Sequence, residues 1–280
     1  MTLVPEKFFD AVAVLEDGQE ESTISPVATG TILGFAVSDQ SDVPEGQTRY
    51  NLFLVTNRHV VEGGSDGLWI RFNQGVGSKR FWLDMKKPNG DDCFVLGDPF
   101  DVAVCVLNGG ALSEGGAEYG VIPDNGFLDL DAMEKQQVGG GDDVFVLGFP
   151  MGLAGTERKY AIARSGAIAR VDREIVSETG SYLIDCTVFP GNSGGPVLLR
   201  PEPVALQGRK PRNKVHLIGI VSGYVPYSDV ATSQQTGRPR VTFEENSGLA
   251  TVVPLDAVID LVDELKALSG TATDTVTDPK

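Results

Sequence analysis

The segment Phe189-Pro-Gly-Asn-Ser-Gly-Gly-Pro-Val197 places one serine among three glycines, between a proline and an apolar run that continues to Leu199. Glycine adopts positive φ angles at no steric cost, so this composition is typical of a tight turn that precedes a strand. Such a turn can leave the Ser193 hydroxyl exposed, as a nucleophile requires. The alternative is an ordinary surface turn, where the same residue types also collect.

A serine that attacks a carbonyl group also needs amide donors about 3 Å from the oxygen that becomes negative. A turn with glycines on both sides of the serine can supply them, because its amides can converge on one point. We therefore predict that the backbone amides of Gly191 and Ser193 form an oxyanion hole. Gly194 and Gly195 would let the chain pass close to a substrate.

The hydroxyl of serine is a poor nucleophile unless a base takes its proton, and that base is most often histidine. The chain has two histidines. His59 follows an apolar, strand-like run that ends at Thr56, whereas His216 lies inside a predicted strand at residues 214–221. An imidazole at the end of a strand can face a cleft. The sequence therefore predicts His59 as the base and His216 as a structural residue.

The base must itself be oriented by an acid, which we expect beside apolar neighbours. Asp101 stands directly before the alternating run Val102-Ala-Val-Cys-Val-Leu107 and meets this description. The chain has 39 acidic residues, so this position alone would not single it out. The order along the chain does, because His59, Asp101 and Ser193 follow one another, each in a motif of its own.

Three motifs, Thr56-Asn-Arg-His-Val-Val61, Asp101-Val-Ala-Val104 and Gly191-Asn-Ser-Gly-Gly-Pro196, resemble in this order those of the trypsin/chymotrypsin-like serine proteases. Within that superfamily the chain is most similar to the bacterial trypsin-like peptidases related to the Deg (high-temperature-requirement) proteases. The resemblance covers about residues 25–260. It implies a serine endopeptidase that acts on a protein or peptide substrate, without a cofactor, through the triad His59, Asp101 and Ser193.

Short β-branched and aromatic runs predict an all-β fold of two six-stranded antiparallel barrels, with the site in the cleft between them. We expect strands at residues 11–15, 28–37, 50–56, 67–72, 81–84 and 102–107, and again at 143–149, 160–171, 181–188, 197–200, 216–224 and 249–253. Residues 254–268 carry apolar side chains at helical spacing and predict an amphipathic helix. The resemblance implies that this helix packs on the outside of the second barrel.

These boundaries divide the chain into residues 1–110 (an N-terminal barrel with His59 and Asp101), 111–141 (a linker), 142–268 (a C-terminal barrel with Ser193, ending in the helix) and 269–280 (a disordered tail). The polar segment 226–245 is predicted to be a long loop beside the cleft.

The resemblance also implies where a substrate binds. The backbone of Ser222, Gly223 and Tyr224 would pair with an extended peptide, and Ser222 would touch the catalytic acid. Strand addition of this kind uses main-chain groups and selects weakly for sequence. Thr187 falls at the base of the primary specificity pocket, where an aspartate would select Arg or Lys, so tryptic specificity is not expected.

One position departs from the digestive members of the superfamily. They carry an aspartate before the nucleophile, which pairs with a new N-terminal ammonium after zymogen cleavage, and this chain has Asn192 there. An amide cannot form that ion pair. Activation by insertion of a new N-terminus is therefore not expected.

Composition argues against several classes of function. The net charge of -16 disfavours nucleic acid, because phosphate binding needs clustered Lys and Arg. No apolar run reaches the ~20 residues that span a bilayer, and residues 1–15 lack the features of a secretory leader, so we expect a cytoplasmic protein that binds no membrane. The three cysteines form no Cys-x-x-Cys motif, which favours neither disulfides nor a metal site.

Two other functions stay open. A non-catalytic binding module of the same fold is disfavoured, because all three triad side chains and the oxyanion turn are present. An esterase could use the same triad, although the serine here is followed by a strand and not by the helix of an esterase nucleophile elbow. The natural substrate, the oligomeric state and the need for a regulatory protein partner are not determined by the sequence.

Overall fold

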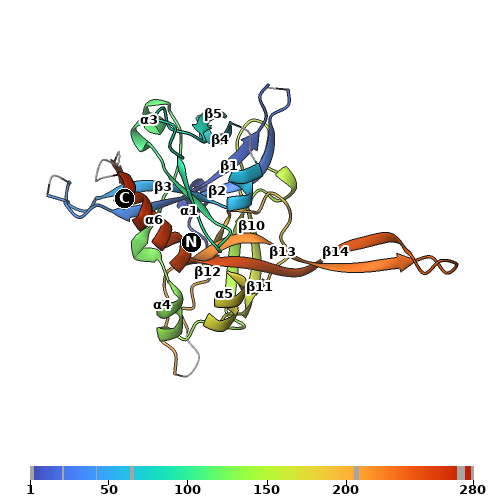
Figure 1. Cartoon of the computed structure of the whole chain (residues 1–280). Coiled ribbons are helices and arrows are strands. Elements are labelled where there is room, and N and C mark those ends of the chain that lie inside the picture. The colour runs from blue at the N-terminus through green and yellow to red at the C-terminus, as the bar shows by residue number, and fades with distance from the viewer. Residues whose placement is uncertain are drawn as a thin grey trace.

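The computed structural model describes residues 3–20, 22–41, 43–63, 66–204, 208–269 and 275–278 (Figure 1). The N-terminal elements are α1 (Glu6–Asp10), β1 (Val12–Asp17), β2 (Ser25–Ala36), β3 (Thr48–Thr56), α2 (Arg58–Gly63), β4 (Gly67–Gln74), β5 (Gly77–Asp84), β6 (Phe94–Leu96), β7 (Ala103–Val106), α3 (Gly109–Glu114), β8 (Ile122–Pro123), η1 (Asp124–Gly126) and α4 (Leu130–Lys135). The C-terminal elements are β9 (Asp143–Gly148), η2 (Pro150–Gly152), β10 (Ile162–Arg170), α5 (Arg173–Thr179), β11 (Tyr182–Asp185), β12 (Pro196–Leu199), β13 (His216–Thr232), β14 (Pro239–Pro254), α6 (Leu255–Ser269) and β15 (Thr275–Asp278).

The N-terminal strands form an open sheet, and not the closed six-stranded barrel that the sequence predicts. The sheet has the order β5-β4-β1-β2-β3-β7-β6, while β8 and β15 pair with β2 and β3 outside this path. Closure would need β5 to pair with β6, but residues 85–93 between them make one isolated bridge, from Lys86 to Asp92. Across the Pro-Asn-Gly turn at 88–90, Lys87 N donates to Asp91 O and Cys93 N donates to Met85 O, but among the described residues this pairing does not continue into β5 and β6.

The C-terminal strands close into a six-stranded barrel in the order β10-β11-β14-β13-β12-β9, as predicted. Its neighbouring strands are all antiparallel. β12 is apolar and buried along its whole length, and it pairs with both β9 and β13. Since β12 begins at Pro196, the barrel holds the chain directly after the turn that contains Ser193.

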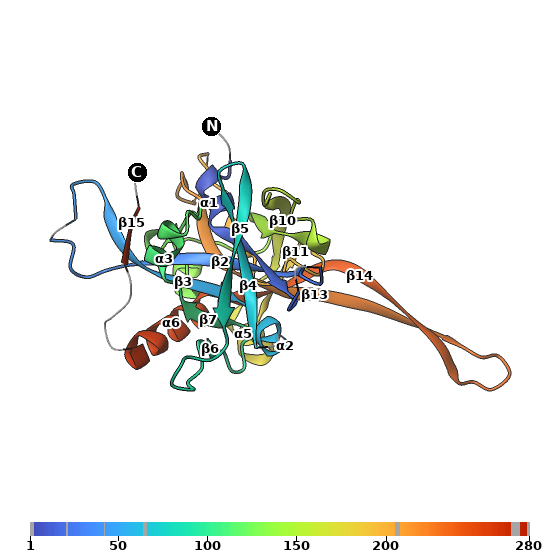
Figure 2. The same ribbon diagram turned by 90° about the horizontal axis from the view of Figure 1, so that it is seen from above.

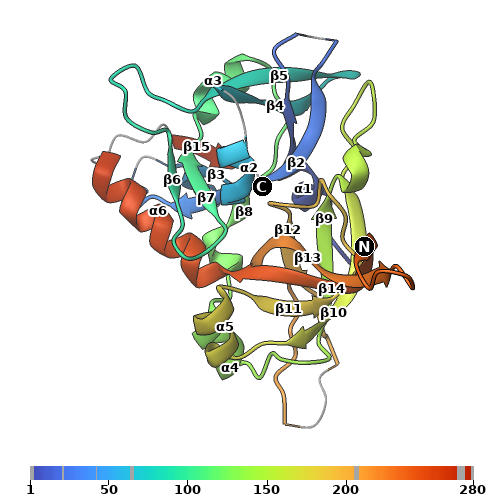
Figure 3. The same cartoon turned by 45° about the vertical axis from the view of Figure 1, so that its right-hand side comes forward.

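The C-terminal helix α6 packs across both groups of strands (Figure 3). Leu255, Val258, Val262 and Leu265 are buried, at the helical spacing that the sequence predicts. They share one apolar cluster with strands of both halves, and α6 contacts β6 and β7 as well as β13 and β14. The helix therefore contacts the N-terminal sheet in addition to the second barrel, on which we expected it.

The segment 226–245, for which the sequence predicts a loop, forms the outer part of a long two-stranded ribbon. β13 and β14 pair from Gly219 with Pro254 out to Thr232 with Pro239, and the ribbon projects away from the rest of the molecule (Figures 1 and 2). Its side chains at 226–232 and 239–245 are exposed. Because no apolar face is buried here, hydropathy carries no strand signal, and only the backbone ladder defines the strands.

Two further segments contain more structure than the sequence suggests. Residues 111–141, predicted to be a linker, contain most of α3 together with β8, η1 and α4, and β8 pairs in parallel with β2. In the predicted tail, Ser269 ends α6 and Thr275–Asp278 form β15, which pairs with β3. The other residues of that tail lie outside the described part of the chain.

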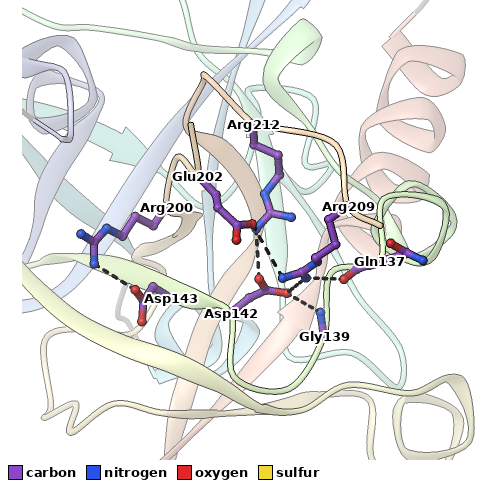
Figure 4. Close-up of polar contacts among 8 residues, drawn as sticks. All are labelled: Gln137, Gly139, Asp142, Asp143, Arg200, Glu202, Arg209 and Arg212. Atoms are coloured by element: carbon purple, nitrogen blue, oxygen red, sulfur yellow. Dashed lines mark hydrogen bonds and ion pairs between the residues drawn. The ribbon is translucent and has the colours of Figure 1, made fainter. Parts of the chain in front are cut away.

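A buried polar cluster fastens the loop after β12 to the turn before β9 (Figure 4). Asp142 Oδ1 lies 3.0 Å from Arg212 Nη2, and its Oδ2 lies 2.6 Å from Arg209 Nη2. Glu202 also pairs with Arg212 Nη2, at 2.8 Å, and Gly139 N donates to Asp142 Oδ2 at 2.8 Å. Burial opposes ionisation of Asp142, but the hydrogen bonds from Arg209 and Gly139 outweigh it and lower the pKa of this carboxyl from its usual value.

Asp142→Asn is expected to lower the free energy of unfolding by about 3 kcal/mol, because Arg212 would keep a buried charge with fewer partners. Since the pKa of Asp142 is lowered in the folded protein, its contribution is present at neutral pH and is lost as the pH falls through the folded-state pKa. The difference between variant and parent in urea unfolding should therefore shrink on acidification.

The neighbouring Asp143→Asn is the matched control for this prediction. Asp143 pairs with Arg200 at 2.9 Å, but the two side chains are 57% and 44% exposed. Exposed pairs of this kind contribute about 0–1 kcal/mol. Equal losses of stability in the two variants would contradict a special role of the buried cluster.

Candidate active site

His59 lies in α2, directly after β3. Its Nδ1 is 2.8 Å from Asp101 Oδ2, and its backbone N donates to Asp101 Oδ1 at 3.0 Å. Between β3 and α2, Asn57 is fully buried and donates through Nδ2 to the carbonyl of Asp101 at 2.7 Å. β3 pairs with β7, which begins just after Asp101. This strand pairing brings together two residues that are far apart in the sequence.

The carboxylate of Asp101 has a further donor from the other half of the molecule, since Ser222 Oγ donates to its Oδ2 at 2.6 Å. Burial opposes ionisation, but hydrogen bonds from His59 and Ser222 outweigh it and lower the pKa of Asp101. The side chains of His59 and Asp101 are 53% and 32% exposed, so the acid is only partly buried. Because Nδ1 of His59 faces Asp101, Nε2 is the ring nitrogen left for a reacting group.

Ser193 is partly exposed, with two buried residues on each side of it in the chain. Its Oγ donates to the carbonyl of Ser222 at 3.2 Å. In the part of the chain that the structure describes, no hydrogen bond joins Ser193 Oγ to His59. Ser222 thus connects Ser193 with the His59–Asp101 pair, and proton transfer to His59 requires the hydroxyl to leave its present acceptor. Hydrogen bonds to a base are often completed only when substrate is bound.

The turn around Ser193 leaves two amides unpaired. Gly191 has φ +96°, the left-handed region that favours glycine. The amides of Asn192, Gly194 and Gly195 donate to backbone carbonyls, whereas those of Gly191 and Ser193 donate to no group among the described residues. These two amides are the ones that the sequence predicts for an oxyanion hole.

Asn192, directly before Ser193, acts inside the turn. It is 1% exposed, and its Oδ1 accepts a hydrogen bond from Phe189 N at 3.0 Å. Asn192 N donates in turn to Phe189 O at 2.9 Å. The amide side chain therefore closes the turn locally with a hydrogen bond and needs no ionic partner.

Two threonines of β2, which the sequence analysis did not single out, hold this turn from the N-terminal half. Thr29 N donates to Ser193 O at 2.8 Å, and Thr29 Oγ1 donates to Gly191 O at 2.7 Å. Thr31 Oγ1 donates to Gly194 O at 2.7 Å. Both threonines are fully buried. One strand of the sheet thus fixes three carbonyls of a turn that belongs to the barrel.

A sequence signal for this role exists in Thr29-Gly-Thr31, inside an otherwise apolar strand. Residues at i and i+2 of a strand point to the same face. Two buried hydroxyls on one face need hydrogen-bond partners, which here come from outside the sheet.

The residues predicted to contact substrate lie next to the turn, on two segments. Ser222, Gly223 and Tyr224 continue β13 beyond its pairing with β12, which ends at Ile220. Thr187 is half-buried in the segment that leads from β11 to the turn. The structure brings Ser222 into contact with both Asp101 and Ser193.

His216 lies away from these groups. It is six residues before Ser222 on β13, which corresponds to about 20 Å along an extended strand. Its ring is half-buried, and burial lowers the pKa of His216. This position agrees with the structural role that the sequence predicts for it.

Among the described residues, no group of three or more His, Cys, Asp or Glu side chains is placed to hold a metal ion. The three cysteines Cys93, Cys105 and Cys186 are free. No described helix is long and apolar enough to cross a membrane.

A family model described as "Trypsin-like peptidase domain" matches residues 33–202, a span that includes His59, Asp101 and Ser193. Among solved structures, the chain is similar to the Drosophila Grass clip serine protease of the Toll pathway, with 15% sequence identity and a TM-score of 0.47. That likeness covers 93% of this chain and 70% of the other. No curated protein matches the sequence.

Proposed function

The chain belongs to the trypsin-like peptidase family, and on this premise we propose that it is a serine endopeptidase with Ser193 as nucleophile, His59 as general base and Asp101 as orienting acid. The observation that carries the proposal is the hydrogen-bonded connection from Ser193 through Ser222 to Asp101 and His59. It is assembled from both halves of the chain, and it brings the nucleophile, the base and the acid of the proposed triad into one network.

In the proposed reaction, Ser193 Oγ attacks the carbonyl carbon of the scissile peptide bond while His59 Nε2 takes the hydroxyl proton. Asp101 holds the proton on His59 Nδ1 and stabilises the imidazolium that forms. The new oxyanion accepts hydrogen bonds from the amides of Gly191 and Ser193. His59 then returns the proton to the leaving amine, and water repeats the same steps to release the acyl group.

Specificity and activation follow from two single residues. Thr187 offers no negative charge to a Lys or Arg side chain of the substrate, which supports a preference other than the tryptic one. Asn192 is occupied by Phe189 within the turn, which supports an enzyme that needs no new N-terminus for activation. A relation to the Deg proteases and a reducing, cytoplasmic environment, in which free cysteines are stable, belong to the same proposal.

A second candidate function is that of a serine peptidase that becomes active only when its substrate or a regulatory protein partner binds. The observation that favours it is the bond from the Ser193 hydroxyl to Ser222 O, which competes with a bond to His59. A ligand whose amide occupied Ser222 O would release the hydroxyl for His59. Activity would then depend on the ligand and not only on the assembled residues.

Labelling with a fluorophosphonate probe tests the proposal, because the probe reacts with an activated serine. We expect labelling of the parent chain, none of Ser193→Ala and much less of His59→Ala. His216→Ala is the matched control and should be labelled like the parent. If the folded parent chain is not labelled, the proposal that the enzyme is active without a partner is wrong. A labelled chain that cleaves esters but no peptide in a library would make it an esterase.

Gly191→Ala is expected to lower kcat by about 10²–10³-fold, the usual cost of losing one oxyanion donor. A Cβ at Gly191 would lie 2.3 Å from Phe149 O, so the turn must shift. The measurement is kcat on a peptide from the library, with thermal unfolding as a check of the fold. Gly126→Ala, where a Cβ would meet nothing within 4 Å, should leave kcat unchanged. An unchanged kcat in Gly191→Ala would show that the Gly191 amide is not part of the oxyanion hole.

A further inference from the structure

A cavity of about 590 Å³ lies where β3 and β13 begin, between the two halves of the chain. Its walls come from α1, β3, β8 and η1 of the N-terminal half and from the loop that joins β12 to β13. Cavities of this size are typical of sites for small organic ligands. Nothing in the proposed peptidase reaction uses this cavity.

The cavity is separate from the candidate active site. Tyr50 lines it near the start of β3, whereas His59 follows the end of that strand. Val215 lines it directly before β13, and Ser222 lies further along that strand. Each strand covers about 20 Å between the cavity and the site. A small ligand in the cavity therefore does not contact Ser193.

The inner wall of the cavity is apolar. The lining side chains of Phe8, Tyr50, Ile122 and Val215 are 7%, 6%, 0% and 7% exposed. Proline rings add to this surface, at Pro5, Pro123, Pro201 and Pro203. Proline has no amide hydrogen, so these positions offer carbon surface and no backbone donor. The cavity therefore favours a ligand whose buried part is hydrocarbon.

The charged side chains that line the cavity are cationic. They belong to Lys7 of α1 and Lys214 of the loop before β13, and both residues are exposed. Among the described residues, neither ammonium group forms an ion pair or a hydrogen bond. The chain as a whole has a net charge of -16, so two unpaired lysines beside one apolar cavity reverse the overall sign of the charge. This local charge favours an anionic group on the ligand.

The acidic residues next to lining residues in the sequence do not cancel this charge. Glu202, between two lining prolines, pairs with Arg212 at 2.8 Å in the buried cluster (Figure 4). Asp124 accepts a hydrogen bond from the last amide of β2 at 2.9 Å. Glu6 lines a different cavity, and Glu45 lines neither. The lysines are therefore the charges that a ligand in the cavity would meet.

We propose that this cavity binds a small carboxylate with an apolar body, of the class of medium-chain fatty acids. The hydrocarbon part lies against the buried side chains of Phe8 and Ile122, and the carboxylate lies at the exposed lysines Lys7 and Lys214. The inference goes beyond the proposed function and does not depend on it. Because the ligand contacts both halves of the folded chain, its binding should also raise the unfolding temperature.

Isothermal titration calorimetry with octanoate and octan-1-ol tests the inference, because these probes share a hydrocarbon chain and differ in the charge of the head group. At low ionic strength, the parent chain should bind octanoate about tenfold more tightly than octan-1-ol, since two lysines attract the carboxylate. Added salt should reduce this preference, because it screens charges at an exposed site.

Lysine variants locate the site. Lys7→Ala and Lys214→Ala should each weaken octanoate binding about threefold and leave the affinity for octan-1-ol nearly unchanged. The double variant should bind the two probes equally. Lys135→Ala is the matched control, because Lys135 belongs to α4 and does not line the cavity. Ser193→Ala should bind octanoate like the parent, which separates the cavity from the candidate active site.

Several results would overturn the inference. They are equal affinity of the parent chain for the two probes, no binding of octanoate, or a double variant that keeps the preference for octanoate. An equal loss in Lys135→Ala would do the same. Loss of octanoate binding in Ser193→Ala would place the ligand in the candidate active site. A parent chain that sediments as a dimer, and that the double lysine variant makes monomeric, would assign the cavity to a second copy. None of these results changes the fluorophosphonate labelling that tests the proposed function.

Discussion

His59→Ala is expected to lower kcat for peptide hydrolysis by about 10⁶-fold, the loss typical of removing the base of a triad. Ser193 would then have no imidazole to take its proton, because the second histidine of the chain, His216, lies on β13 away from Asp101. The His59 side chain is 53% exposed, so its truncation should leave the thermal unfolding temperature nearly unchanged. The measurement is single-turnover hydrolysis of a peptide, with unfolding followed in parallel.

The matched control for this experiment is His216→Ala. It removes the same functional group at a position about 20 Å along β13 from Ser222. The variant should keep kcat within about twofold of the parent. A His59→Ala chain that is folded and keeps more than about a hundredth of the parental kcat would contradict the assignment of the base.

Asp101→Asn is expected to lower kcat by about 10⁴-fold without unfolding the chain, as in other triads that lose this charge. The carboxylate accepts from His59 N, holds His59 Nδ1 at 2.8 Å and accepts from Ser222 Oγ. The single oxygen of an amide can accept only some of these hydrogen bonds. An amide nitrogen that faces His59 Nδ1 would favour the tautomer in which Nδ1 carries no proton, which is the wrong one for catalysis. The measurement is kcat for the same peptide.

Ser222→Ala tests whether the charge of Asp101 or its hydrogen bond from Ser222 matters more for holding His59 in place. It removes one hydrogen bond to Asp101 and leaves the carboxylate and its contacts with His59, so kcat should fall only about tenfold. Asp101 should also stay ionised to a lower pH than an unperturbed aspartate, because hydrogen bonds from His59 and Ser222 lower its pKa against the effect of burial. Equal losses in Asp101→Asn and Ser222→Ala would show that the charge is not what orients His59.

Much of the local structure could be predicted because it depends on neighbouring residues. The glycines around Ser193 predict a turn, and Gly191 has the positive φ that the turn requires. Short β-branched and aromatic runs predict the strands of the C-terminal barrel, and the buried side chains of these strands are mostly apolar. The helix that begins at Leu255 follows from the spacing of its apolar side chains.

Other features depend on contacts between distant segments, which local patterns do not encode. The closure of the N-terminal sheet depends on whether its two edge strands meet, and β5 and β6 do not pair in the described part of the chain. The ribbon at 226–245 pairs through its backbone while its side chains stay exposed, so hydropathy does not reveal it. Apolar periodicity reports buried faces and is silent where strands pair without burial.

The sequence by itself determined the residue types of the site and their order: a serine in a glycine turn, a histidine after a strand and an aspartate before one. Those signals are local, because a turn, a strand end and an alternating run each need only a few neighbouring residues. Only the tertiary structure decided that Thr29 and Thr31 hold the serine turn, and that Ser222 links Ser193 to Asp101. Those hydrogen bonds join strands of different sheets, and their partners are set by how the two halves pack.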